Sequence, residues 1–115
     1  MLDKTAPHTG TRATGPLAGF RIVEFAGIGP GPFACMLLAD MGADVIKIES
    51  PEGDLMRANG VVEVPGMSSI FLALNRNKRS VVLDLKTEAG RARALAIAKA
   101  TEGVTSVKDS LRIAK

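Results

Sequence analysis

Three short runs rich in valine, isoleucine and leucine stand out along the chain, and each is bounded by glycine, proline or polar residues. They are Arg21–Phe25, Asp44–Glu49 and Ser80–Leu85. Such runs predict β-strands that are buried on both faces of a sheet. An apolar segment, Phe33–Met41, lies between the first two and predicts a helix. A helix that links two strands in this way makes the strands parallel neighbours.

The helix expected over Phe33–Met41 has clear start and stop signals. Pro32 suits the first position of a helix, and Gly42 suits its end. Asp40 is its only charged residue, so we predict that the helix is buried on more than one side.

Two further helices are predicted from capping residues. Ser68 or Ser69 can cap a short helix over Ile70–Leu74, and Thr87 can cap a longer one from Glu88 to about Ala100. A glycine in the first turn of the longer helix weakens that helix by roughly 1 kcal/mol relative to alanine.

These elements predict an α/β fold: an open parallel sheet fragment of about three strands, in the order β-α-β, loop, short helix, β-α. We expect residues 1–15 to be a flexible tail, residues 16–100 to form the domain, and Leu55–Gly66 to be a loop. Residues 101–115 form a C-terminal tail, in which a capping box at Ser106–Asp109 permits a short helix. Both edges of such a sheet lack a partner, so the pattern looks like the first part of a doubly wound domain.

Composition narrows the classes of function. The chain has 115 residues and a formal charge of +3, 46% of its residues are hydrophobic and 3% are aromatic. One small globular domain fits this length, and the scarcity of aromatic residues argues against binding nucleic acid. No apolar run is long enough to cross a membrane as a helix. The single Cys35 excludes an internal disulfide, and without a secretory leader we expect a cytoplasmic location.

The turn Gly27–Pro32 is the most informative segment, because it follows a strand and opens a helix, where phosphate can bind. Two of its glycines match the dinucleotide fingerprint, and Glu49 ends the next strand, where a ribose-binding acid is expected. Pro32 stands in the place of the third glycine, and Pro30 removes an N–H donor. NAD-type binding is one interpretation, and a tight turn without a ligand is another.

Other candidate residues are weaker. The basic turn Asn75–Arg79 is either a phosphate clamp or an exposed connector, and Lys86 is a separate candidate at the far end of the third predicted strand. Cys35 is expected to pack as a small apolar residue and not to act as a nucleophile. His8 lies in the tail and is expected to be solvated.

Several separated blocks then carry a family resemblance. Gly15–Phe25, Gly27–Phe33, Leu38–Glu49 and Phe71–Lys86 resemble, in order, the N-terminal portion of the class III CoA-transferases and α-methylacyl-CoA racemases. The resemblance covers about residues 15–100. It implies a Rossmann-like domain that binds coenzyme A, and an intertwined homodimer of chains several times longer.

The resemblance also implies cofactor-binding residues. Ile28 and Gly29 match loop residues that contact the nucleotide end of CoA, and Leu83 and Lys86 match residues near its adenine. Ser50 stands where many members carry an arginine that helps to bind CoA. We therefore expect coenzyme A as the cofactor, in the form of an acyl-CoA substrate or product, and no metal. A CoA thioester and self-association are the expected partners, with no nucleic acid and no membrane.

The resemblance leaves two reactions open. The racemase moves a proton α to a thioester carbonyl, whereas the transferase uses an aspartate nucleophile to exchange CoA between carboxylates. After Ala100 the family continues into a strand that the segment Thr101–Ser106 does not match, and its catalytic aspartate has no counterpart here. We therefore expect a truncated fragment limited to CoA binding, with no catalytic residue. The alternatives are an inactive, frameshifted product without a ligand, or a small dinucleotide-binding module.

Overall fold

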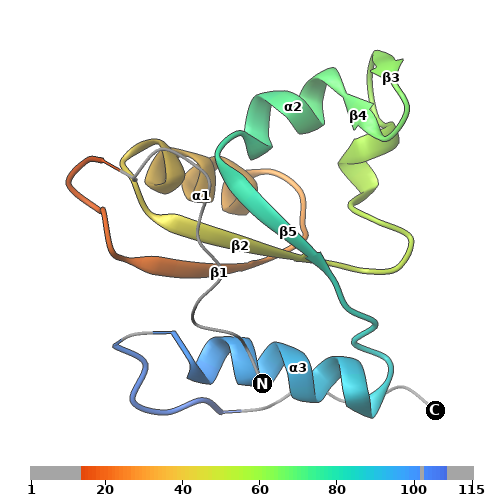
Figure 1. The fold of residues 1–115 in the computed structure, drawn as a ribbon. Coiled ribbons are helices and arrows are strands. Elements are labelled where there is room, and N and C mark those ends of the chain that lie inside the picture. Colours follow the sequence, from red (N-terminus) through yellow and green to blue (C-terminus); the bar gives the residue numbers. More distant parts are fainter. Residues whose placement is uncertain (1–13, 102, 109–115) are drawn as a thin grey trace.

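A computed structural model describes residues 14–101 and 103–108 of the chain. Its centre is a parallel sheet of three strands in the spatial order β1-β2-β5 (Figure 1). The strands are β1 (Arg21–Phe25), β2 (Asp44–Glu49) and β5 (Lys78–Val82). The predicted α/β fold with an open, parallel, three-stranded sheet is therefore confirmed.

Helices α1 (Pro30–Asp40) and α3 (Glu88–Lys99) lie on opposite sides of this sheet (Figure 1). Successive side chains of a strand point to opposite faces, so each face of the sheet can offer apolar residues to the helix that covers it. Val45 of β2 packs against Ala39 of α1, and Ile48 packs against Ala94 of α3. Cys35 packs at the margin of the first cluster, as the small apolar residue that its sequence context predicts.

The segment between β2 and β5 holds more structure than the predicted loop. It contains a 3-10 turn, η1, a two-stranded antiparallel hairpin and a short helix, α2 (Figure 1). Their bounds are η1 Leu55–Ala58, β3 Val62–Val64, β4 Met67–Ser68 and α2 Ser69–Asn75. The strands of this hairpin are very short and mostly exposed, so they leave no run of buried apolar positions from which sequence could predict them.

The predicted helix caps are present. The Ser68 hydroxyl accepts the Phe71 N–H at 3.0 Å, and the Thr87 hydroxyl accepts the Gly90 N–H at 3.1 Å. Helix α1 begins two residues before Pro32, because Gly29, with φ at 82°, takes the cap position and a proline follows it.

Three expectations from the sequence differ from the structure. The third strand was predicted over Ser80–Leu85, but β5 runs from Lys78 to Val82. It starts earlier because the turn that precedes it closes at Asn77, whose φ is +63°. Helix α1 is buried along one face only: Phe33 and Leu37 are 49% and 43% exposed, since no described element packs over them. Residues 104–108 lie in no helix or strand, and the rest of the predicted terminal helix, like residues 1–13 of the tail, lies outside the described residues.

Replacing Gly90 with alanine is expected to destabilise the fold, although alanine is the better helix former. A Cβ atom at this position would lie 2.0 Å from the carbonyl oxygen of Asp84. Because that oxygen belongs to the backbone, the turn before α3 would have to shift, at a cost of about 2 kcal/mol. Chemical unfolding followed by far-UV circular dichroism measures the effect, since the chain has no Trp or Tyr.

Gly31→Ala is the matched control, because a Cβ atom there meets no other atom within 4 Å. It should be neutral or stabilise the chain by up to about 1 kcal/mol through helix propensity. An increase in stability on Gly90→Ala would contradict the close approach of α3 to Asp84.

Candidate functional site

The carboxyl ends of β1, β2 and β5 surround a hollow of about 390 Å³, which we call the strand-end hollow. Ligands of open parallel sheets bind at this edge, where the loops after the strands converge. Its walls are the turn after β1, the turn after β2 and the segment between β5 and α3. The lining residues are Phe25–Ile28, Ile48–Leu55 and Leu83–Lys86.

Four of the five residues implied by the family resemblance line the strand-end hollow. Ile28 comes from the turn after β1, Ser50 from the turn after β2, and Leu83 and Lys86 from the segment after β5. Gly29 lies one residue beyond the lining and caps α1. The fold thus brings three segments that are distant in sequence to one place.

The strand-end hollow has an apolar base and a charged rim. Ile48 and Leu83 are both buried at its base. The rim carries Glu52, Asp84 and Lys86, and the Asp84 carboxylate accepts the Lys86 backbone N–H at 3.0 Å. A flat apolar group with polar substituents therefore fits this surface better than a compact anion does.

The turn Ser50–Gly53 forms one wall and is closed on itself. The Gly53 N–H donates to the Ser50 carbonyl at 2.9 Å, and the Ser50 hydroxyl donates back to the Gly53 carbonyl at 3.3 Å. Its two flanking residues, Glu49 and Asp54, are 1% and 5% exposed. Both ends of the exposed turn are therefore fixed in the protein interior.

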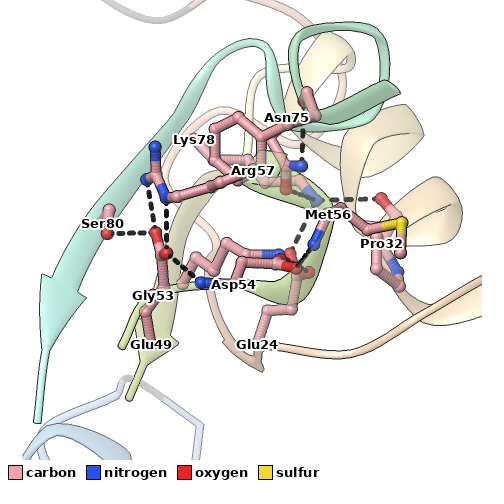
Figure 2. Close-up of polar contacts among 12 residues, drawn as sticks. Glu24, Pro32, Glu49, Gly53, Asp54, Met56, Arg57, Asn75, Lys78 and Ser80 are labelled. Atoms are coloured by element: carbon pink, nitrogen blue, oxygen red, sulfur yellow. Dashed lines mark hydrogen bonds and ion pairs between the residues drawn. The ribbon is translucent and has the colours of Figure 1, made fainter. Parts of the chain in front are cut away.

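Glu49 is held by four hydrogen bonds (Figure 2). Arg57 donates to both carboxylate oxygens at 2.7 Å, Ser80 donates its hydroxyl at 2.6 Å, and Asp54 donates its backbone N–H at 2.8 Å. The bidentate bond from Arg57 is the main cause that lowers the pKa of Glu49 to about 2. Glu49 is therefore ionised and fully engaged inside the protein.

A second set of buried charges lies beside the first (Figure 2). Lys47, which is 1% exposed, contacts Glu24 at 3.0 Å and Asp54 at 2.6 Å. Lys78 contacts the other oxygen of Glu24 at 2.7 Å and donates to the Pro32 carbonyl at 2.9 Å. Each buried carboxylate oxygen of this set is thus contacted by a lysine or by a backbone N–H.

This ionic network was not predicted from the sequence. Glu24 and Lys47 face each other across the paired strands β1 and β2, one acid and one base directly opposite. Charges of opposite sign at matching positions of two strands that are buried on both faces are the signal that could have revealed the pair. Asp54 and Arg57 gave no comparable signal, because Arg57 lies in the expected loop Leu55–Gly66 and Asp54 immediately precedes it.

The turn before α1 is a poor site for a pyrophosphate. Pro30 and Pro32 lack an N–H, and the Phe33 N–H already donates to the Gly29 carbonyl at 3.4 Å. Glu49, which the dinucleotide interpretation would assign to a ribose, is buried, and its carboxylate already accepts four hydrogen bonds from within the protein. Both observations argue against NAD.

The basic segment Asn75–Arg79 does not reach the strand-end hollow, because it leads into β5 and ends within its first residues, at the other end of that strand. Its cations contact internal carboxylates. Arg76 pairs with Asp40 at 2.6 Å, and Arg79 pairs with Asp44 at 2.6 Å. The structure therefore favours a connecting role over a phosphate clamp.

Other candidate chemistries find little support in the described part of the chain. Burial raises the pKa of the Cys35 thiol, and the nearby Glu24 raises it further, which disfavours a thiolate. Among residues 14–101 and 103–108, no three His, Cys, Asp or Glu side chains are grouped to hold a metal ion. No helix in these residues has the length and apolarity needed to cross a membrane.

Comparison with known proteins decides the family. The model of CoA-transferase family III matches residues 17–105. This chain belongs to CoA-transferase family III. The resemblance drawn from the sequence is thereby confirmed for the transferases.

Two curated relatives within CoA-transferase family III give the scale of the match. A succinate–glutarate CoA-transferase of Agrobacterium fabrum is 49% identical over 82 residues, which are 65% of this chain and 20% of the relative. A formyl-CoA:oxalate CoA-transferase of Streptomyces avermitilis is 43% identical over 79 residues, which are 68% of this chain and 19% of the relative. The chain thus spans about a fifth of the length of the curated relatives it matches.

Solved structures agree with the family assignment. A CAIB/BAIF family protein from Brucella suis superposes with a TM-score of 0.65 at 45% identity, over 73% of this chain and 24% of that one. A hypothetical protein from Mycobacterium tuberculosis superposes with a TM-score of 0.68 at 38% identity, over 77% of this chain and 24% of that one.

Acid should destabilise this family III chain through Glu49. Its pKa is lower in the folded chain than the ordinary value of 4.5, so ionised Glu49 stabilises the fold above that pH. This stabilisation, about 3 kcal/mol at neutral pH, is lost as the pH falls through about 2. Chemical unfolding at a series of pH values measures the loss.

Glu49→Gln is expected to be less stable at neutral pH but to lose less stability than the wild type between pH 4.5 and 2. Glu63→Gln, which removes an exposed carboxylate from the hairpin, should keep the wild-type pH profile. An identical pH profile for Glu49→Gln and the wild type would refute the assignment.

Proposed function

We propose that the strand-end hollow binds the nucleotide end of coenzyme A, and that the protein takes part in CoA transfer between carboxylic acids. The observation that carries this proposal is the convergence of Ile28, Ser50, Leu83 and Lys86 at the carboxyl edge of a parallel sheet. The family resemblance implies that Ile28, Leu83 and Lys86 match CoA-contacting positions and that Ser50 stands where many members carry an arginine. The chain belongs to that family.

The surface of the hollow suits an adenosine. Ile28 and Leu83 among the lining residues offer apolar contacts to a flat base. The ribose hydroxyls can donate hydrogen bonds to the Glu52 or Asp84 carboxylates at the rim, and Lys86 is the cation that meets a phosphate. The Glu49 and Asp54 carboxylates repel such a ligand little, because Arg57 and Lys47 neutralise them.

Transferase chemistry has the stronger support of the two reactions that the sequence leaves open. The curated relatives compared here carry transferase names, including succinate–glutarate and formyl-CoA:oxalate CoA-transferase. These names include the dicarboxylic acids succinate, glutarate and oxalate and the thioester formyl-CoA. We therefore propose a CoA thioester and a carboxylic acid as the substrate class of the whole protein.

Direct binding tests this proposal. Isothermal titration calorimetry of the chain with CoA, ADP and NAD should show binding of CoA and ADP and weaker binding of NAD. The dinucleotide-binding arrangement places the NAD pyrophosphate at the start of the helix, where Pro30 and Pro32 lack N–H donors, whereas the proposed CoA site places a phosphate at Lys86 in the strand-end hollow. Tighter binding of NAD than of CoA would overturn the proposal in favour of a dinucleotide-binding module.

Lys86→Ala should weaken CoA binding by about ten-fold, because one charge-assisted contact to a phosphate is lost. Lys99→Ala, at the far end of α3, removes an exposed lysine of equal charge and should bind CoA as the wild type does.

We further propose that the 115-residue chain self-associates. Strands β1 and β5 are the edges of the sheet, and the outer face of α1 exposes Phe33 and Leu37. Unpaired edges and contiguous apolar side chains both favour contact with a second chain. Size-exclusion chromatography with light scattering and refractive-index detection should show dimers or larger species. A monomer with one sharp unfolding transition would contradict this expectation.

A further inference from the structure

Arg57 lies behind the wall of the strand-end hollow and does not line it. Its side chain belongs to a second hollow of about 290 Å³, which is bordered also by Phe71 and Ser80. Glu49 borders both hollows, so Arg57 can act on the strand-end hollow through it. The Arg57 side chain also lies beside Gly53, since a Cβ atom on Gly53 would be 3.3 Å from its Cδ.

Arg57 is itself held in one orientation. Its guanidinium carbon lies 3.9 Å from the centre of the Phe71 ring, and its remaining nitrogen donates to the Gly66 carbonyl at 3.0 Å. The two nitrogens that face Glu49 form a bidentate pair with it (Figure 2). A stacked, forked guanidinium of this kind fixes both the position and the rotation of the carboxylate.

The fixed carboxylate in turn holds the turn Ser50–Gly53. Glu49 is the residue immediately before the turn, and its Oε2 accepts the backbone N–H of Asp54, the residue immediately after it. Asp54 also caps η1 by accepting the Met56 N–H at 2.8 Å. The Glu49 carboxylate therefore holds together the two ends of the four-residue turn Ser50–Gly53, which forms one wall of the strand-end hollow.

From these contacts we infer that Arg57 is a positioning residue for ligand binding: through Glu49 it sets the place of the Ser50–Gly53 turn against the nucleotide of coenzyme A. The inference rests on the proposed function for the identity of the ligand, but its effect on the turn does not depend on that identity.

Two substitutions test the inference in the full 115-residue chain. Arg57→Gln removes the charge and the fork, and should weaken CoA binding in calorimetry by roughly ten-fold or more, since small displacements of a binding group are costly. Arg57→Lys keeps the charge but can hold only one carboxylate oxygen, and should recover part of the affinity. Arg57→Lys also serves as the test if Arg57→Gln does not fold.

Arg76→Gln is the matched control. Arg76 borders the same second hollow and forms its own two-nitrogen contact, with Asp40, at 3.1 and 2.6 Å. It does not contact the turn, so this variant should bind CoA as the wild type does. Equal affinity of the wild type and Arg57→Gln, or an equal loss in Arg76→Gln, would overturn the inference.

Hydrogen exchange supplies a readout that a general loss of stability would not produce. In Arg57→Gln the amides of Gly53 and Asp54 should exchange at least about ten-fold faster, because local opening of the turn is no longer opposed. The Asp44 amide, bonded to the Phe20 carbonyl at 2.8 Å at the opposite end of the sheet, should keep its rate. Equal acceleration of all three amides would mean a merely structural role.

The two readouts separate the possible failures. A wild-type chain that binds no CoA, but whose Gly53 and Asp54 amides respond to Arg57→Gln, would refute the proposed function and keep the positioning of the turn. Unchanged exchange at both amides would refute the positioning, whatever the ligand.

Discussion

Charge balance in the interior is the constraint on which the rest of this structure depends. Three carboxylates and three cations are brought together under η1 and α2, and their formal charges cancel. They are Glu24, Glu49, Asp54, Lys47, Arg57 and Lys78. Removing one partner of a buried pair typically costs about 3–5 kcal/mol, because the other charge is left uncompensated. Each of the six side chains must therefore stay close to its partner of opposite charge, and this fixes the elements that carry them. The Glu24–Lys47 pair aligns β1 with β2, and Lys78 joins β5 to both β1 and the first turn of α1.

The two ends of the sheet differ in what their charged residues contact. At the amino end, Asp44 of β2 is contacted by Arg21 of β1 and by Arg79 of β5, so one acid ties together all three strands. At the carboxyl end the strands are followed by the three segments that line the strand-end hollow, and Lys86 is the cation among the lining residues. Within the described residues, many of the basic side chains on the strands and their connections therefore serve to join elements of the fold through contacts with carboxylates.

The sequence predicts those parts of the fold that local signals determine. The strands β1 and β2 and the caps Ser68 and Thr87 follow from apolar runs and from single capping residues, which act within a few positions. The hairpin β3–β4 was missed because its strands carry too few buried positions to leave a pattern. The role of Gly90 was also misjudged, since propensity describes the helix alone and the approach of the Asp84 backbone is a tertiary contact.

The candidate site was likewise predictable from the sequence only in part. Four residues implied by the family resemblance meet in one hollow because each follows a strand of a parallel sheet, a placement that chain order alone determines. The role of Arg57 could not be predicted in this way, because it depends on the bidentate hydrogen bonds that its guanidinium donates to Glu49. On the proposed function, Arg57 matters more because the family resemblance implies an arginine where this chain has Ser50. A short side chain cannot reach for a ligand, so the turn that bears it must already lie in the correct place.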